Sequence, residues 1–450
     1  MSNPAPRENI HNETAPPDHG PELHALQDHF AEMDSVAIGE ELGRMDRVER
    51  ASAFRVLPKV RALDVFEDLD VPLQHELIED LRGAATAEIF THLDPDDRAS
   101  MLEELPAGIV SQLLSGLSRH ERDMTTDLLG YPVRSIGRRM TPEVVYVAAN
   151  ATVAQALARV RAQGHDAETI YALPVVGEGR KVVGVVSLRR LFLTSDDEIV
   201  REISSEPVMV RARDDQEDAA RVVRDNGMIA VPVVDDEDRL LGILTVDDAM
   251  RILELEEDED AARTGATAPL GRPYLSVGPF TLVKSRVGWL LILVAAATLT
   301  INVLNHFEAA LDEVVALALF VPLLIGTGGN AGSQSATTIV RALAVGDVRS
   351  KDVFRVIFRE MSTGVILGLT LAAIGFLPAA LFVGLDMAAV VAVTIVAICT
   401  LATTVGAVIP IVARWAGVDP AVVSAPFIST VVDATGLIVY FLVAQAILGI

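Results

Sequence analysis

Residues 422–450 read VVSAPFISTVVDATGLIVYFLVAQAILGI, a run long and apolar enough to cross a bilayer. One ionisable side chain, Asp433, lies in the middle of this run, with Ser429 and Thr435 close by. A carboxylate at membrane depth costs about 2.5–3.5 kcal/mol, so a chain retains one where it faces water or a partner. We interpret the segment as the lining of a cation pathway. The alternative is a structural pair with a buried Arg or a backbone group, but no other span offers a cation at mid-membrane.

The formal net charge of −25 is unevenly distributed over the 450 residues. Residues 271–450 contain nine basic and nine acidic side chains, whereas residues 1–270 contain 28 and 53. The sequence therefore predicts an acidic soluble part followed by a neutral membrane part. The acidity disfavours binding of nucleic acid and of anionic lipid, and it favours binding of hard cations. The single cysteine, Cys399, excludes a disulfide framework.

Leucine recurs every twelve residues from Leu57 to Leu129, and Met45 follows the same spacing. One short helix with its turn fills about twelve residues, so we expect an all-α helical solenoid over residues 21–138. Residues 1–20 are polar and rich in Pro and Asn, and we expect a disordered tail. Acids such as Asp96, in the first turn of a predicted helix, more often interact with the helix dipole than with a metal.

Residues 139–252 contain a repeat of another kind. IYALPVVGEGRKVVGVVSLRRL (170–191) matches MIAVPVVDDEDRLLGILTVDDA (228–249) at an offset of 58 residues. A helical pattern precedes each copy, so the order of elements predicts a small α/β unit used twice.

These two copies resemble tandem CBS domains, a family that often regulates channels and transporters and includes members that bind adenine nucleotides. The nucleotide signature of the family is Ser or Thr followed three residues later by Asp. The second copy retains it as Thr245 and Asp248, whereas the first copy has Ser187 and Arg190. The resemblance leaves nucleotide binding, ATP included, as an open alternative.

Residues 253–280 are expected to form a strongly acidic connecting helix between the repeats and the membrane part. Like charges four residues apart repel by about 0.2–0.5 kcal/mol, so this helix requires cations or is a solvated linker. We favour a cation-responsive element, because the helix leads to the membrane and because Asp215 and Glu217 add ligands from outside it. Oxygen ligands alone favour Mg²⁺ or Ca²⁺ over Zn²⁺.

Five apolar spans are expected in residues 281–450, which predicts a polytopic α-helical membrane domain. Lys and Arg border the first span, the loop between the second and third, and the end of the fourth, whereas the opposite loops contain none. The positive-inside rule then makes the soluble domains cytoplasmic and places the C-terminus outside, in a multi-pass protein of the plasma membrane. The expected spans are about 286–305, 314–341, 361–385, 387–413 and 421–449.

The second span contains PLLIGTGGNAGSQSATTIVRA (322–342), and its glycines predict an unwound stretch at membrane depth. Unwound backbone survives there only beside a cavity or buried in protein. Its carbonyls, together with Asn330 and Gln334, are candidates to hold a hydrated ion. The plain alternative is close helix packing by small residues. Glu360 adds a second acid at the cytoplasmic edge of the third span.

Three segments resemble motifs of the MgtE-type magnesium channels: PLLIGTGGNAGSQSAT, REM around Glu360, and APFISTVVDATGLIVY. The resemblance covers nearly the whole chain and implies a homodimer in the lipid bilayer with a pore on its two-fold axis. It implies that Asp433 of each subunit flanks a hydrated Mg²⁺. The pore residues that it implies are Asp433, Ser429, Gly326, Gly329, Asn330 and Glu360.

The resemblance also implies that cytosolic Mg²⁺ binds between the soluble domains and the connecting helix and closes the pore. The regulatory acids that it implies are Asp215, Glu217, Asp248, Glu256, Glu259, Asp260 and Asp96. Three positions depart from the family pattern: Ser333 replaces a frequent second Asn, and Arg251 and Gly227 replace acids. Fewer acids predict weaker sensing of Mg²⁺.

We therefore expect a Mg²⁺-selective channel that imports Mg²⁺. One alternative is a transporter of another divalent cation such as Co²⁺, or one coupled to Na⁺ or H⁺. Another is a membrane-anchored nucleotide or cation sensor without transport, which leaves Asp433 unexplained. We expect no enzyme, because the sequence contains no Ser/His/Asp or Cys/His arrangement and no metal-hydrolase spacing.

Overall fold

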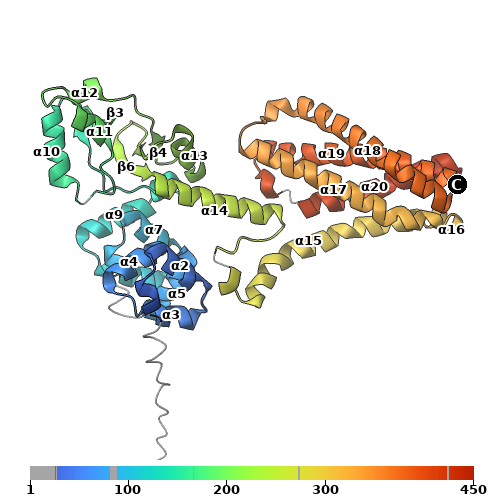
Figure 1. Cartoon of the computed structure of the whole chain (residues 1–450), viewed down its shortest axis with the longest axis horizontal. Coiled ribbons are helices and arrows are strands. Elements are labelled where there is room, and N and C mark those ends of the chain that lie inside the picture. Colours follow the sequence, from blue (N-terminus) through green and yellow to red (C-terminus); the bar gives the residue numbers. More distant parts are fainter. Residues whose placement is uncertain (1–25, 27, 82–88, 166, 272–273, 423–424) are drawn as a thin grey trace, which may run out of the picture. The chain divides into compact units, whose positions relative to one another are not determined.

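The computed structural model describes residues 26, 28–81, 89–165, 167–271, 274–422 and 425–450 (Figure 1). The predicted tail, residues 1–20, lies outside the described residues. The chain forms two compact units. The first contains residues up to 250 together with 271–276, and the second contains 251–270 together with 277–450.

The N-terminal part of the first unit is helical, as the twelve-residue spacing predicts. Leucines of that spacing, such as Leu69, Leu93 and Leu117, are at most 5% exposed and pack in one apolar core. Side-chain caps mark the start of some of these helices: Asp46 accepts hydrogen bonds from two backbone amides, and Ser118 forms a capping box. The helices are α2 (Ser35–Arg44), α3 (Arg47–Phe54), α4 (Lys59–Glu67), α5 (Val71–Leu81), α7 (Pro95–Glu104), α8 (Ala107–Gly116) and α9 (Arg119–Leu129).

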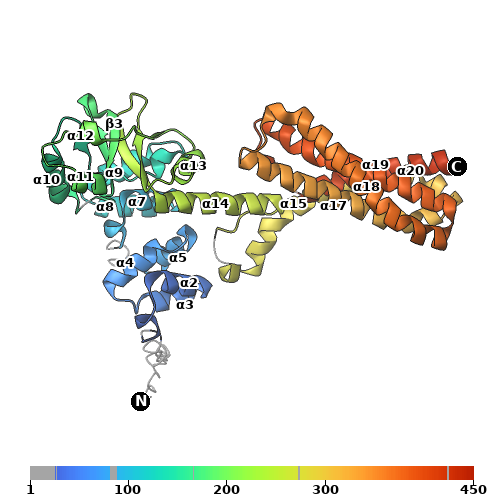
Figure 2. The same cartoon turned by 45° about the horizontal axis from the view of Figure 1, so that its top comes forward.

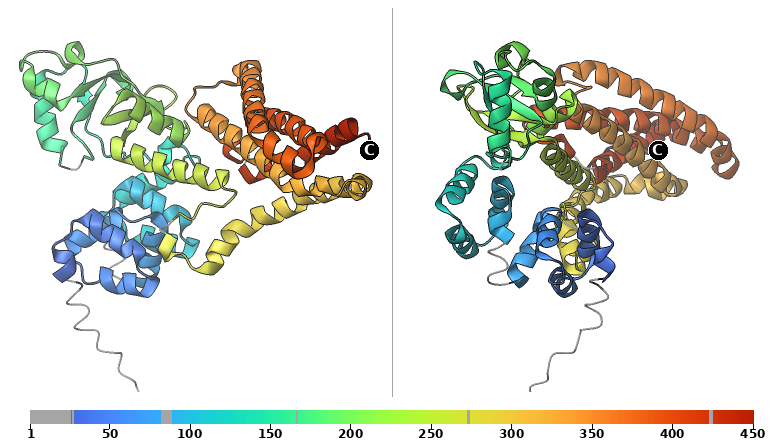
Figure 3. Two further views of the ribbon diagram at one scale, coloured as in Figure 1. Left: turned by 45° about the vertical axis from the view of Figure 1, so that its right-hand side comes forward. Right: turned by 60° about the vertical axis from the view of Figure 1, so that its left-hand side comes forward.

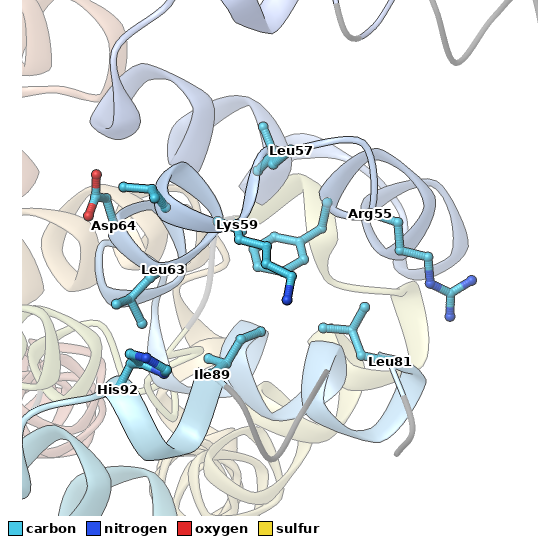
Figure 4. Close-up of a pocket in the computed structure, with 11 residues that line it drawn as sticks. Arg55, Leu57, Lys59, Leu63, Asp64, Leu81, Ile89 and His92 are labelled. Carbon is cyan, nitrogen blue, oxygen red and sulfur yellow. The ribbon is translucent and has the colours of Figure 1, made fainter. Parts of the chain in front are cut away.

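An open pocket of about 380 Å³ lies in this helical part (Figure 4). Its walls are mostly apolar, and its charged lining residues are Arg55, Lys59 and Asp64. Two cations and one carboxylate around an apolar surface disfavour a divalent cation, so the ion chemistry must be sought elsewhere.

The two repeats form two matching three-stranded sheets, which confirms the predicted α/β pair. In each sheet the first strand is parallel to the second, and the second is antiparallel to the third. Val175 pairs with Gly184, and Val233 pairs with Gly242, so the offset of 58 residues holds in the register. The strands of the first repeat are β1 (Val147–Ala148), β2 (Ala172–Val176) and β3 (Val182–Ser187), and those of the second are β4 (Val210–Arg211), β5 (Ala230–Val234) and β6 (Leu240–Thr245).

The helices of the repeats complete these α/β units. The first repeat has α10 (Val153–Gln163), α11 (Leu188–Leu193) and α12 (Val200–Ile203), and the second has α13 (Gln216–Asn226). Helix α14 (Val246–Thr264) begins directly after β6 and runs through the acidic segment. The acidic connector is thus a continuation of the last helix of the second repeat, and it ends well before residue 280.

The second unit contains five helices long and apolar enough to cross a membrane, as predicted. Helices α17 to α20 run side by side (Figure 2), and α15 contacts α20 (Figure 3). Glycines allow the closest approaches: a Cβ on Gly364 or Gly368 of α18 would lie 2.5–2.6 Å from atoms of α19. The five are α15 (Pro279–His306), α17 (Ala316–Ala344), α18 (Val353–Val383), α19 (Leu385–Trp415) and α20 (Ala425–Leu448), with the short α16 (Glu308–Glu313) between the first two.

Candidate functional site

Asp433 lies at mid-length of α20 and is half-buried. Its Oδ1 atom is buried and has no hydrogen-bond partner among the described residues. Gly329 of α17 faces it: a Cβ there would lie 2.4 Å from Ser429 Oγ and 3.4 Å from Asp433 Oδ1. The bare backbone of Gly329 thus gives the carboxylate and the hydroxyl room beside α17. The structure therefore brings together Asp433, Ser429 and Gly329.

The glycine-rich stretch of α17 is continuously helical, so the prediction of an unwound segment is wrong. Close packing explains the glycines instead. A Cβ on Gly328 would lie 2.5 Å from Ile398 Cγ2, and one on Gly332 would lie 3.2 Å from Ile428 Cγ2. This tertiary packing offsets the low helix propensity of glycine. Within the helix, the backbone carbonyls of Gly326 and Gly329 take part in the regular i to i+4 hydrogen bonding.

One side of α17, which we call the polar face, is exposed in the single chain. Asn330, Gln334, Thr337 and Arg341 lie on it with Gly326, at helical spacing, whereas neighbours such as Gly329 are buried. Amide groups turned toward lipid would lack hydrogen-bond partners at a cost of several kcal/mol. The polar face therefore requires water or another protein surface.

Glu360 belongs to a different cluster, in which three helices meet. Its Oε2 and the carbonyl oxygen of Thr403 each lie 2.8 Å from Ser335 Oγ, and the single hydroxyl hydrogen of Ser335 is shared between these two acceptors. Thr403 Oγ1 donates to the Glu360 carbonyl oxygen, also at 2.8 Å. These bonds join α17, α18 and α19, so the fold itself satisfies Glu360.

Two of the regulatory candidates, Asp215 and Glu217, have local structural partners. Asp215 caps α13, and its Oδ1 accepts a hydrogen bond of 2.9 Å from the Glu217 amide. Glu217 forms an ion pair with Arg221 one turn later. Gly227 ends α13 with a left-handed φ of 60°, which explains why it stands where an acid was expected.

Helix α14 contains a basic partner that the sequence reasoning missed. Arg263 forms ion pairs with Glu259 and with Asp419, which precedes η5 (Pro420–Val422) and α20. Glu256, on the same helix, is 7% exposed. The acids of α14 are therefore partly neutralised from within the second unit. The i,i+4 spacing on α14 could have predicted the ion pair of Arg263 with Glu259, but no sequence pattern predicts the pair with Asp419.

Asp96, at the start of α7, lies in an acidic neighbourhood within the first unit. Burial raises its pKa well above the usual range, and the charges of Asp248 and Asp97 raise it further. Burial and nearby acids also raise the pKa of Glu67 and that of Glu168 to about 7. The structure thus brings Asp96 and Asp248 together. Over the described ranges, however, no three Asp, Glu, His or Cys side chains are arranged to hold a metal ion.

The nucleotide signature is formed but bonded internally. Thr245 Oγ1 donates to Asp248 Oδ2 over 2.6 Å. In the first repeat, Ser187 Oγ accepts from the Arg190 amide over 3.1 Å and caps α11. Both hydroxyls therefore stabilise the start of the helix that follows the third strand of their repeat.

Comparison with known proteins finds matches along most of the chain. The divalent cation transporter family model MgtE matches residues 321–443, the MgtE intracellular N domain matches 33–134, and the CBS domain matches 133–195 and 200–255. The magnesium transporter MgtE of Thermus thermophilus is 38% identical and covers 92% of each chain. That of Bacillus subtilis is 31% identical over 85% of each chain.

Solved structures match the soluble part. The cytosolic domain of the Mg²⁺ channel MgtE in complex with ATP is 34% identical, with a TM-score of 0.47. The match covers 51% of this chain and 94% of that one.

Proposed function

The chain belongs to the MgtE family of divalent cation transporters, and from that premise we propose that it forms a Mg²⁺-selective channel. The observation that carries the proposal concerns a carboxylate oxygen in a membrane-spanning helix. Asp433 Oδ1 has no hydrogen-bond partner among the residues that the structure describes, and it lies beside α17. Membership of a transporter family agrees with the expectation that the chain is not an enzyme.

We place the pore between two copies of the chain. A second copy would cover the polar face of α17 and leave a water-filled path along it. Mg²⁺ sheds its water reluctantly and is held through one or two carboxylates, so Asp433 of each copy would bind the hydrated ion. Ser429 and Asn330 would accept hydrogen bonds from its waters, and Gly326 and Gly329 would line the path without side chains. Glu360 would lie toward the cytoplasmic end.

We further propose that the channel imports Mg²⁺. Under the positive-inside rule, the basic loops favour soluble units in the cytoplasm and a C-terminus outside the plasma membrane. The inside-negative membrane potential then drives a divalent cation inward.

We propose that cytosolic Mg²⁺ closes this channel by binding the soluble acids. Asp96 and Asp248 repel each other, and their repulsion is relieved by a bound cation. Glu256, Glu259 and Asp260 on α14 and Asp215 and Glu217 on the second repeat would add further contacts. ATP bound at Thr245 and Asp248 would be a second ligand that regulates the channel.

Mg²⁺ flux into liposomes that contain the purified chain tests the proposal. We expect flux that Asp433→Ala abolishes and that falls when Mg²⁺ is high on the cytoplasmic face. The matched control is Asp386→Ala, an acid at the start of α19 that the pathway does not include.

Each alternative predicts a different result in the same vesicles. Equal flux of Co²⁺ would indicate a less selective divalent transporter, and flux that requires a Na⁺ or H⁺ gradient would indicate coupling. Retained flux in Asp433→Ala would overturn the pore assignment. Absence of flux under every condition would favour the sensor without transport.

A further inference from the structure

The turns between the second and third strands of the two repeats share one backbone feature and carry opposite charge. The first turn reads GEGRK (177–181) and the second reads DDEDR (235–239). Arg180 and Asp238 occupy equivalent positions, with left-handed φ values of 61° and 64°. A non-glycine residue in this region most often is Asn or Asp, so an Arg there is unusual.

The arginines at the second turn are neutralised by acids. Arg239 lies 3.4 Å from Asp235 and 3.6 Å from Glu237, and Arg211 lies 3.5 Å from Asp238. These are ordinary exposed ion pairs, each complete within the second repeat.

The arginines at the first turn have no such partners. Arg159 of α10 and Arg180 both lie over the ring of Tyr146, with their Cζ atoms 4.4 and 5.1 Å from its centroid. Across the described part of the chain neither forms an ion pair, and the buried Nε of Arg159 has no hydrogen-bond partner. Glu178, the one carboxylate in the turn, is exposed.

Tyr146 lies beside both guanidinium groups, at the turn end of the two sheets. Its ring packs against an apolar cluster at the turn end of both sheets, which includes Val176, Val182 and Val234. An aromatic face attracts a guanidinium group, and the N–H groups at the guanidinium edge then remain able to donate. Two cations gathered within a strongly acidic protein favour an anion as the missing partner.

We propose that Arg159 and Arg180, beside Tyr146, bind an oxyanion of the phosphate class. The planar guanidinium edge matches the oxygens of phosphate and donates two parallel hydrogen bonds to them. This site is distinct from the nucleotide signature. Thr245 and Ser187 stand at the opposite end of the paired strands from the turns, about 17 Å away at the usual strand rise. The phosphate is free in solution or belongs to a nucleotide.

Isothermal titration of the full-length chain with inorganic phosphate tests this proposal, with ionic strength held constant by chloride. We expect saturable binding that Arg159→Gln and Arg180→Gln each weaken at least tenfold. The matched control is Arg239→Gln, which removes an equivalent charge from the second turn and should leave phosphate binding unchanged. The melting temperature of each variant without phosphate verifies the fold.

Titration with ATP then tells whether the bound phosphate belongs to a nucleotide or is free in solution. ATP that competes with phosphate, and whose own binding weakens in Arg180→Gln, would identify a nucleotide as the source. ATP binding that Arg180→Gln leaves unchanged would identify free phosphate. The proposal is overturned if titration of the natural chain with millimolar phosphate gives no heat of binding. It is also overturned if both variants at the first turn bind phosphate as the natural chain does.

Discussion

Asp433 and Glu360 are both acids in membrane-spanning helices, yet their surroundings differ. Glu360 accepts a hydrogen bond from Ser335 and, through its backbone, one from Thr403. Asp433 Oδ1 has no partner within the described chain and faces the bare backbone of Gly329. A buried acid with protein partners is part of the fold, whereas one without them remains available to a ligand. The difference favours Asp433 over Glu360 as the acid that would contact the ion in the proposed pore.

Neutralising Asp433 and neutralising Glu360 should change Mg²⁺ flux by very different amounts, and we expect this to be the largest effect. We expect Asp433→Asn to lower Mg²⁺ flux at least a hundredfold, because the hydrated ion loses its charged contact. Glu360→Gln retains an oxygen that accepts from Ser335, so we expect a flux change below tenfold. Initial rates in liposomes at matched protein content give both values. Equal losses in the two variants would place both acids in direct contact with the ion.

Filling the space beside Asp433 should have the next largest effect. A Cβ at Gly329 would clash with Ser429 Oγ, and we expect Gly329→Ala to lower Mg²⁺ flux at least tenfold. Gly288→Ala on α15 is the matched control, because no atom lies within 4 Å of the added Cβ. If Gly329→Ala has the same Mg²⁺ flux as the natural chain, the side chains around Asp433 can rearrange without loss of transport.

The acids of α14 allow a similar comparison between more buried and exposed carboxylates outside the membrane helices. Neutralising three acids on the more buried side of α14 should raise the cytosolic Mg²⁺ concentration needed for half-inhibition several-fold, because Mg²⁺ loses its proposed contacts. Three exposed acids of the same helix form a control with the same change in charge, and we expect a smaller shift. Equal shifts would indicate a general charge effect. The first set is Glu256, Glu259 and Asp260, and the second is Glu254, Glu257 and Asp258.

A smaller effect is expected in the pH dependence of stability of the first unit. The pKa of Glu67 and that of Glu168 are raised to about 7, so the folded state favours their protonated forms. Their contribution is present at low pH and is lost as pH rises through about 7. Without divalent cations, the melting temperature should therefore fall between about pH 5 and pH 8. Added Mg²⁺ should reduce that fall, and Glu67→Gln with Glu168→Gln should flatten it.

Features with a strong local signal could be predicted from the sequence. The five membrane helices follow from long apolar runs, and the register of the two sheets follows from an offset that preserves Pro174 and Pro232. The placement of Asp433 on the last helix follows in the same way.

Features that depend on distant contacts could not be predicted. Glycine propensity favours an interruption in α17, but contacts with Ile398 and Val432 outweigh that propensity. Asp419 is 156 residues from Arg263, so no local pattern points to their ion pair. The partners of Glu360 likewise come from two other helices.

The turns at Arg180 and Asp238 have a consequence for how duplicated domains diverge. The φ values of these two residues agree within a few degrees although their side chains carry opposite charge, but the preceding residue is Gly179 with a φ of 68° in the first turn and Glu237 without a positive φ in the second. After an internal duplication, the charge at one turn position can therefore change sign while the backbone at that position is kept. Exchanging Arg180 and Asp238 alone should move this charge between the halves, whereas exchanging the whole GEGRK and DDEDR loops would also place a Glu where Gly179 has a φ of 68°.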